Sequence, residues 1–420
     1  MNVNELKGKT VALAASGGLD SCTITKWLSE YGVSVIAITA DLGQPDETDM
    51  QTIRKRMLSC GAKEALVIDL KEEMAHAGIR LIQTRACYEG GYWNTTGLAR
   101  HVTVSGLLRV MKKKKVSILA HGATGRGNDQ VRFSLATHML DPKVEVYAPW
   151  RDESFIEAFG GRKEMIDFCQ KKHLPIKASH DKPYSTDSNL LGLTHEAGKL
   201  EWLDTPADFI QPVMGVFPKD APDKKLTVFV EFKSGIPVAI NSEKLKPVDL
   251  FRKANEIAGK NGIGIGIHTI ENRFVGIKSR GVYESPGLVF LSHCYEFLLQ
   301  QILDRRARKC YEAAAANLGE QIYQGYFFDL ASQMMLSALT PVTRLASGLI
   351  GVSLYKGTIL FYSSSKTPHS LYDPELSSME AVGIFNHADS EGFLRVLGVN
   401  ARALNLKGQV DLKGPVEKKG

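Results

Sequence analysis

The sequence predicts an α/β protein in which a doubly wound parallel sheet is followed by an α+β domain and a C-terminal tail. Short β-branched runs alternate with amphipathic segments over roughly the first 150 residues, the pattern of a parallel sheet with crossover helices. The alternation stops near residue 170, and apolar runs flanking Ser234-Gly235 and Lys356-Gly357 then predict antiparallel hairpins. We therefore predict domains at 1–170 and 171–366 and a tail at 367–420.

Local patterns predict the individual elements. In the first domain we expect strands at 11–15, 33–39, 65–70, 116–120 and 144–148, and helices at 21–31, 47–60 and 163–172. Residues 178–189 are expected to form a loop. The second domain should hold a strand pair at 226–232 and 237–241, a helix at 248–260, a mainly helical stretch at 288–325 and a hairpin at 349–362. The tail has weak periodicity and is either a subunit-clasping arm or partly frayed.

Composition narrows the class of protein. With 44% hydrophobic and 23% charged residues, the 420-residue chain is globular rather than disordered. The net charge of +6 is small and suits polyanionic ligands without requiring nucleic acid. The lysine run at 112–115 falls at the end of a predicted helix, where cations meet the negative end of the dipole. We expect no nucleic-acid partner.

Location follows from what the chain does not contain. No signal-peptide pattern begins the sequence, and no stretch approaches the roughly 20 apolar residues of a membrane span. The six cysteines are scattered, without the paired spacing of zinc or dithiol sites. We expect a cytoplasmic protein with reduced thiols, no membrane partner and no metal-ligand cage.

A phosphate site is predicted where the first strand meets its helix. There Ser16-Gly-Gly-Leu-Asp-Ser21 places two glycines where backbone N–H groups can approach phosphate oxygens, and the serine hydroxyls add donors. The segment lacks the Gly-Lys-Ser/Thr ending of a Walker A loop and is not a dinucleotide fingerprint. The alternative, an ordinary strand–helix turn, does not account for the paired serines and Asp20.

A second polar loop follows the strand at 116–120. Its glycines allow a tight backbone, while Thr124, Asn128, Asp129 and Arg132 provide donors, an amide and both charges. This mixture suits a zwitterionic amino-acid ligand. A helix N-cap at Asn128 or Asp129 is an alternative role that is compatible with the first.

Two further segments are rich in polar residues. One is 184–189 with Thr194-His195-Glu196, which turn chemistry alone explains about half the time. The other is 270–286, where Glu271 and several cations follow a strand-like pattern; a solvated charged edge is the competing interpretation.

These motifs resemble those of a known enzyme family. The loop at 16–21 resembles the pyrophosphate loop (PP-loop) of the N-type ATP pyrophosphatases, which cleave ATP to AMP and pyrophosphate on an adenine nucleotide alpha hydrolase-like fold. Taken in order from about residue 11 to 372, the segments resemble the argininosuccinate synthase family. The blocks 39–47 and 185–189 further resemble its bacterial branch with longer variants.

The resemblance implies an activity. Members join citrulline and aspartate at the cost of ATP, through a citrulline-adenylate, and release argininosuccinate, AMP and diphosphate in arginine biosynthesis and the urea cycle. It also implies Mg²⁺ on the ATP phosphates and a homotetramer held partly by C-terminal arms. A tRNA-modifying PP-loop ATP pyrophosphatase is the alternative enzyme, and a nucleotide-binding sensor without turnover is the alternative outside enzymes.

The resemblance also assigns residues. ATP would contact Ala14, Ala15, Ser16, Gly17, Gly18, Leu19, Asp20, Ser21, Cys22, Ala40, Gly122, Thr124, Asp129 and Asp187. Aspartate would contact Thr124, Asn128 and Asp129, and citrulline would contact Tyr92, Asn128, Arg132, Ser185, Thr194, Glu196, Glu271 and Tyr283.

Two positions depart from the family pattern. Cys22 replaces a frequent Ser, and since a thiol is a poor donor, we expect only its backbone to contact ATP. Gly97 replaces a Ser that contacts citrulline in some members, which leaves Thr95 or Thr96 as a substitute.

Overall fold

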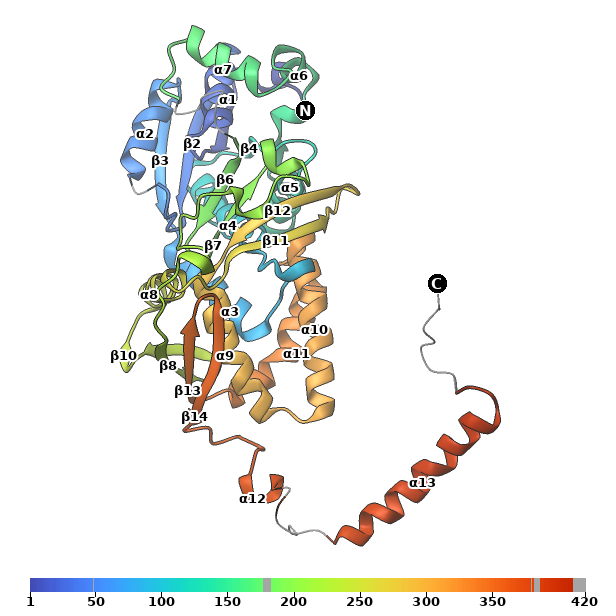
Figure 1. Ribbon diagram of the computed structural model, residues 1–420. Coiled ribbons are helices and arrows are strands. Elements are labelled where there is room, and N and C mark those ends of the chain that lie inside the picture. The colour runs from blue at the N-terminus through green and yellow to red at the C-terminus, as the bar shows by residue number, and fades with distance from the viewer. Residues whose placement is uncertain (48, 177–182, 379, 381–385, 411–420) are drawn as a thin grey trace. The chain divides into compact units, whose positions relative to one another are not determined.

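The computed structural model describes residues 1–47, 49–176, 183–378, 380 and 386–410. The chain divides into two compact units, Met1–His369 and Ser370–Gly420 (Figure 1). The predicted boundary near residue 170, inside the first unit, stays a prediction.

The first sheet is the predicted parallel sheet. It comprises β1 (Thr10–Ala14), β2 (Ser34–Asp41), β3 (Glu64–Asp69), β4 (Ile118–His121) and β5 (Glu145–Tyr147) in the order β3-β2-β1-β4-β5. Every neighbouring pair is parallel. The chain runs outward from β1 to β3 and then crosses back to β4. The carboxyl ends of β1 and β4 therefore flank a topological switch point, where ligands of such sheets bind.

Helices cover both faces of this sheet. Val11 and Leu13 of β1 pack with α1 (Leu19–Glu30), α2 (Met50–Ser59) and α7 (Arg162–Lys171). Ala12 between them packs on the other face with α4 (Thr95–Lys114). Alternate side chains of one strand thus serve two cores, which confirms the doubly wound prediction. The lysines at 112–114 occupy the last turn of α4, as predicted.

The second sheet is antiparallel. Its strands are β8 (Leu226–Lys233), β9 (Ile236–Ile240), β10 (Glu243–Lys244), β13 (Gly348–Tyr355) and β14 (Thr358–Ser365), in the order β10-β9-β8-β13-β14. Both predicted hairpins are confirmed. Their turns place Ser234-Gly235 and Lys356-Gly357 at positive φ, a conformation that glycine adopts readily.

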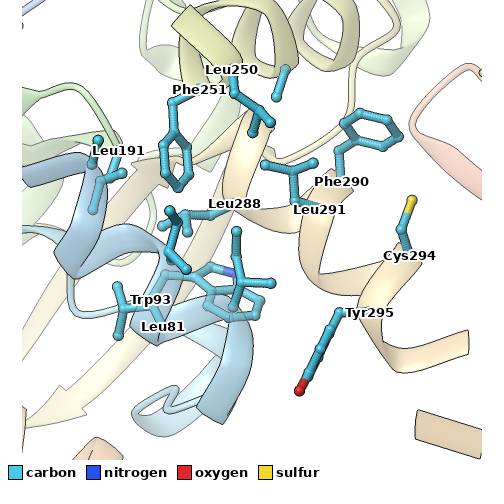
Figure 2. Packing of buried hydrophobic residues seen from close by; sticks show 14 of the residues in the cluster. Leu81, Trp93, Leu191, Leu250, Phe251, Leu288, Phe290, Leu291, Cys294 and Tyr295 are labelled. Atoms are coloured by element: carbon cyan, nitrogen blue, oxygen red, sulfur yellow. The ribbon is translucent and has the colours of Figure 1, made fainter. Parts of the chain in front are cut away.

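One hydrophobic core joins this sheet to the helices of both halves of the first unit. Leu81 of α3 (Lys71–Thr84) packs in it with residues of α8 (Pro247–Lys260) and α9 (Pro286–Ile302), as Figure 2 shows. The predicted helical stretch at 288–325 is two helices, α9 and α10 (Arg305–Gln324), separated where Asp304 caps the Ala307 N–H. The remaining longer helices are α5 (Asn128–Leu140), α6 (Glu153–Ala158) and α11 (Leu330–Leu345), and short 3₁₀ turns lie at 3–6, 89–91, 149–151, 198–201, 207–209 and 218–220.

The third sheet corrects one prediction. It comprises β11 (Ile265–Asn272), β12 (Lys278–Glu284), β7 (Gly192–Glu196) and β6 (Ser185–Asn189), in the antiparallel order β11-β12-β7-β6. The loop predicted for 178–189 is therefore wrong at 185–189, where the short polar residues pair with β7. Their backbone groups are satisfied by the neighbouring strand rather than by turns. Residues 178–182 lie outside the described residues.

The second unit contains α12 (Pro374–Ser377) and α13 (His387–Leu406). The weak periodicity of the tail is therefore helical over 387–406, and no side chain of α13 is buried. Across the described part of the chain, no helix has the length and apolar character needed to span a membrane.

Candidate active site

The loop between β1 and α1 has the shape of an anion site. Gly17 lies at φ +74°, and a Cβ there would approach Ile53 Cγ2 to 2.7 Å, so only glycine fits. The Ser16 N–H donates to Ser21 Oγ over 3.0 Å, and the Gly18 N–H donates to Ser16 Oγ over 3.3 Å. No side chain caps α1 at Gly18. The first N–H groups of α1 are therefore available to an anion.

Two side chains hold the backbone of this loop in place. Arg56 of α2 donates through Nη1 to the Gly17 carbonyl over 2.7 Å, and the buried Cys22 thiol donates to the same oxygen over 3.7 Å. Since the Cys22 thiol is directed at the loop backbone, the expectation that its side chain does not contact ATP is consistent with this geometry.

Asp20 is held by a residue that sequence reasoning missed. Trp150 donates its Nε1–H to Asp20 Oδ1 over 3.0 Å. Burial raises the pKa of Asp20, although the hydrogen bond from Trp150 opposes this effect. Trp150 lies 130 positions away in the sequence and has no motif around it.

The second loop leads into α5 one or two residues earlier than predicted. The N-cap is Gly127, not Asn128 or Asp129, and those two residues begin the helix itself. Their side chains are therefore directed to other partners. Asn128 Oδ1 accepts the Phe274 N–H over 3.0 Å, which leaves the Asn128 amide N–H₂ as a donor.

Arg100 of α4 joins two predicted carboxylates. It contacts Asp129 Oδ2 over 2.8 Å and also pairs with Asp187 on β6. Arg132 contacts the other oxygen of Asp129 over 2.8 Å. Arg100 belongs to the same polar block as Tyr92, but the sequence did not single it out because its partners are remote in the chain.

The network sets the charges of both carboxyl groups. Burial would raise the pKa of Asp129, but Arg100 and Arg132 outweigh it and lower that pKa to about 2. Asp187 differs because burial and the charge of Asp129 outweigh Arg100 and raise its pKa. Asp129 is therefore the more firmly ionised of the two.

Strand register brings six predicted residues to one face of the third sheet. Ser185 lies opposite Glu196, Asp187 opposite Thr194, and Thr194 opposite Tyr283. Opposed residues in antiparallel strands point to the same side, and every second residue repeats that side. The face therefore carries Ser185, Asp187, Thr194, Glu196, Tyr283 and, through its pairing with Ser279, Glu271.

Tyrosines enclose Glu271 on this face. Tyr283 and Tyr323 both donate hydroxyls to Glu271, the latter over 2.6 Å. Tyr92 stacks on Tyr283 with ring centroids 4.3 Å apart. Burial raises the pKa of Glu271, while the two phenol hydrogen bonds and Arg132 oppose it. Tyr323 of α10 was not identified from the sequence, because its partner Glu271 lies 52 positions away.

The region around Arg132 contains an unused donor. Arg132 Nε donates to the Tyr323 carbonyl over 2.9 Å, while the buried Nη2 has no hydrogen-bond partner among the described residues. A Cβ at Gly97 would lie 3.4 Å from Arg132 Cζ. Position 97 therefore faces this guanidinium.

The two threonines considered as substitutes at Gly97 differ in their contacts. Thr96 Oγ1 lies 2.9 Å from Thr194 Oγ1, on the predicted site face. Thr95 Oγ1 is buried without a hydrogen-bond partner among the described residues. The geometry favours Thr96 as the hydroxyl that takes part in the site.

Glu196 has an unusual acidity. Desolvation, followed by the charges of Asp129 and Asp187, raises the pKa of Glu196 to about 7, although the residue as a whole is exposed to solvent. Its charge therefore changes within the physiological pH range.

Several contacts connect the third sheet to the region of the first. Arg100 bridges the start of α5 to β6, and Ser188 of β6 donates its hydroxyl to Asp46 in the loop after β2. The Leu190 N–H donates to the Leu42 carbonyl over 2.9 Å. The alanines at 14, 15 and 40 lie at the carboxyl ends of β1 and β2, and Gly122 and Thr124 follow β4. No hydrogen bond among the described residues joins the Ser16–Ser21 loop directly to the third sheet.

Comparisons with known proteins identify the family. The model described as Arginosuccinate synthase N-terminal HUP domain matches residues 10–175, and the Arginosuccinate synthase C-terminal domain matches residues 184–404. The chain belongs to the argininosuccinate synthase family. It is similar to the argininosuccinate synthase of Rhodopirellula baltica, with 41% identity over 94% of this chain and 97% of that protein. The Thermotoga maritima relative is 40% identical over 94% of this chain and 96% of its own.

The solved structures add little. A predicted subunit of tRNA methyltransferase from Methanocaldococcus jannaschii is 17% identical, covering 38% of this chain and 75% of that chain, with a TM-score of 0.27. That likeness is too weak to carry an argument. Membership of the argininosuccinate synthase family does not favour the alternative of a tRNA-modifying enzyme.

Replacing Arg100 tests the ion network. Arg100→Leu leaves two carboxylates near each other without their shared cation, and we expect it to lower the free energy of unfolding by about 3 kcal/mol at pH 7. Because the pKa of Asp129 is lowered in the folded protein, the stabilisation is present above its unfolded value of about 4 and is lost as pH falls towards 2. The difference in the free energy of unfolding between Arg100→Leu and the unaltered protein, measured by urea unfolding, should therefore become smaller below pH ~4.

Arg109→Leu is the matched control, because it removes an exposed pair with Glu73 from the same helix. We expect it to change stability by less than ~1 kcal/mol. Equal losses in the two variants would contradict the role given to Arg100.

Proposed function

We propose that this chain ligates citrulline and aspartate at the expense of ATP, forming argininosuccinate, AMP and diphosphate through a citrulline-adenylate. The observation that carries the proposal is the Arg100 bridge, which joins the start of α5, the helix that follows β4 of the first sheet, to the polar face of the third sheet. Membership of the argininosuccinate synthase family supports the same activity, in arginine biosynthesis.

ATP would place its phosphates on the Ser16–Ser21 loop. The exposed N–H groups at the start of α1 match the charge of the pyrophosphate that leaves. Mg²⁺ usually binds through one or two carboxylates together with substrate phosphates, and the described residues contain no group of three metal-ligating side chains. This fits an ion carried by the phosphates, with Asp20 as the carboxylate that the loop offers, and the ion would neutralise phosphate charge.

Citrulline would lie against the third sheet. The buried Nη2 of Arg132, which has no partner among the described residues, is a donor for a carboxylate. Glu196 and Glu271 are acceptors for an α-ammonium group. Tyr92 and Tyr283 provide a stacked aromatic wall beside the Thr96–Thr194 hydroxyl pair. These contacts would leave the ureido group free to face ATP.

Aspartate would bind at the second loop. Asp129 has a pKa lowered to about 2 by Arg100 and Arg132 and so carries a full charge for an ammonium ligand at neutral pH. The Asn128 amide N–H₂ and the Thr124 hydroxyl are donors for carboxylates.

The reaction follows from these positions. The citrulline ureido oxygen attacks the α-phosphorus, a P–O bond forms, and the bond to diphosphate breaks. The aspartate amine then attacks the activated ureido carbon, a C–N bond forms, AMP departs and the amine loses a proton. The protein contributes alignment of the three substrates and fixed charges at the departing phosphates.

We expect multiple-turnover release of diphosphate only when ATP, citrulline and aspartate are all supplied, because without aspartate the citrulline-adenylate is not consumed and release stops after one turnover. A coupled diphosphate assay with each substrate omitted in turn measures this requirement. If calorimetry shows ATP binding whose affinity is the same with and without citrulline, and no turnover follows, the chain is instead a nucleotide sensor.

The acidity of Glu196 predicts a pH effect. Below pH ~7 its carboxyl is protonated and loses its attraction for an ammonium group, so kcat/KM for citrulline should fall as pH decreases through that value. Glu196→Gln should give a lower, flat profile over the same range. If the pH profile of kcat/KM for citrulline keeps its inflection in Glu196→Gln, the assignment of Glu196 to the citrulline site is wrong.

We also propose a cytoplasmic homotetramer in which α13 serves as a subunit-clasping arm. All six cysteines are free, which fits a reducing compartment. Apolar residues at helical spacing, including Phe393, Val396 and Leu397, are 52–72% exposed on α13, an arrangement typical of a helix that packs against a partner.

A charge in this apolar stripe should weaken assembly. Light scattering of the unaltered chain should give about four times the mass of one chain, and Leu397→Asp should give smaller species. Ser390→Asp, at an exposed polar position of α13, is the control and should keep the larger mass. A monomer in the unaltered chain would contradict the proposal.

A further inference from the structure

The back of the third sheet contains a buried polar pair that contacts none of the predicted substrate residues. His195 of β7 and Glu284 of β12 are both 0% exposed, and His195 Nε2 lies 2.6 Å from Glu284 Oε1. His195 lies between Thr194 and Glu196, and Glu284 directly follows Tyr283. Because side chains alternate along a strand, the pair points away from the face that carries those three residues.

Glu284 has further partners that tie a loop to the sheet. The Val213 N–H lies 3.0 Å from both carboxylate oxygens, and the Met214 N–H donates to Oε2 over 2.7 Å. Met214 lines a cavity that also borders Asp41 and Gln44 at the end of β2. The carboxylate thus connects β7, β12 and the chain at 213–214.

The pair lies directly behind the predicted citrulline contacts. Thr194 and Tyr283 are opposite one another across β7 and β12, and each is the chain neighbour of one member of the pair. The Tyr184 ring contacts the His195 ring edge-on, with centroids 5.3 Å apart, just before β6 begins. A displacement of His195 or Glu284 would therefore be transmitted to Thr194 and Tyr283 through a single peptide unit.

The chemistry of the pair favours one geometry. Val213 and Met214 donate to the Glu284 carboxyl group from the backbone, and His195 Nε2 lies within hydrogen-bond distance of the same group. His195 Nδ1 is buried without a hydrogen-bond partner among the described residues, whereas Nε2 pairs with Glu284, and the Glu284 carboxyl group also holds the backbone at 213–214. Moving either side chain would leave further desolvated groups without partners, which favours the observed arrangement. Full burial keeps both side chains from touching a substrate.

We propose that His195 and Glu284 are positioning residues that hold Thr194 and Tyr283 in the geometry that binds citrulline. The inference rests on the proposed assignment of Thr194 and Tyr283 to that substrate. Supporting contacts of this kind matter because a binding group must be held to within about half an ångström of its productive position.

Steady-state kinetics of three variants test the pair. Glu284→Ala should raise KM for citrulline about tenfold and leave KM for ATP and for aspartate within about twofold. Glu284→Gln should restore KM for citrulline to within about threefold, because an amide oxygen still accepts the backbone N–H groups and the amide N–H₂ can pair with His195 Nε2. Ile210→Ala removes a buried side chain from a hydrophobic cluster on the back of the third sheet but leaves the pair of His195 and Glu284 intact.

The control separates positioning from stability. Ile210→Ala should lower Tm, as large-to-small core changes do, and leave KM for citrulline unchanged. If Glu284→Ala lowers Tm but leaves KM for citrulline as it is, or if the glutamine variant rescues nothing, the positioning role is wrong.

A fourth variant distinguishes this inference from the site assignment. Thr194→Val removes the hydroxyl that faces Thr96 and should raise KM for citrulline on its own. An effect of Thr194→Val without one of Glu284→Ala would overturn only the positioning role. No effect of Thr194→Val would overturn the citrulline assignment on which that role depends.

Discussion

Arg100 is the side chain on which the site depends most. It extends from α4, which packs on the parallel sheet, and pairs with one carboxylate at the start of α5 and another on β6. Without it, two carboxylates within reach of the same guanidinium would repel each other, and the third sheet would lose its charged contact with the start of α5. The cation therefore both holds the two sheets together and keeps Asp129 ionised.

The second constraint is strand register. Each site residue contributed by β6, β7, β11 and β12 lies on one face because antiparallel pairing and the two-residue repeat leave no other arrangement. A shift of one residue in β7 would move Thr194 and Glu196 to the back of the sheet and bring His195 to the site face. The pairing of His195 with Glu284 on the opposite face is a contact that such a shift would break.

Much of the first domain was predictable from sequence. The five strands and their helices have strong periodicity, and the Ser16–Ser21 loop contains the glycines and serines that its geometry requires. The second sheet was predictable from its two hairpin turns, since left-handed residues such as Gly235 and Gly357 mark them. Local chemistry was sufficient in these regions.

Long-range contacts were not predictable. Residues 185–189 contain short polar side chains typical of turns, and only pairing with β7 makes them a strand. Arg100, Trp150 and Tyr323 act through partners 29 to 130 positions away, so no local pattern identified them. The N-cap was predicted at Asn128 or Asp129, one or two residues after Gly127, because the sequence did not show that the side chains of those two residues contact distant partners.

The most direct test of this account is a crystal structure with citrulline and a non-hydrolysable ATP analogue bound. We expect the analogue's phosphates on the Ser16–Ser21 loop and citrulline on the face that carries Thr194, Glu271 and Tyr283, with its ureido oxygen about 3–3.5 Å from the α-phosphorus. Citrulline bound away from that face, or out of reach of the α-phosphate, would contradict it.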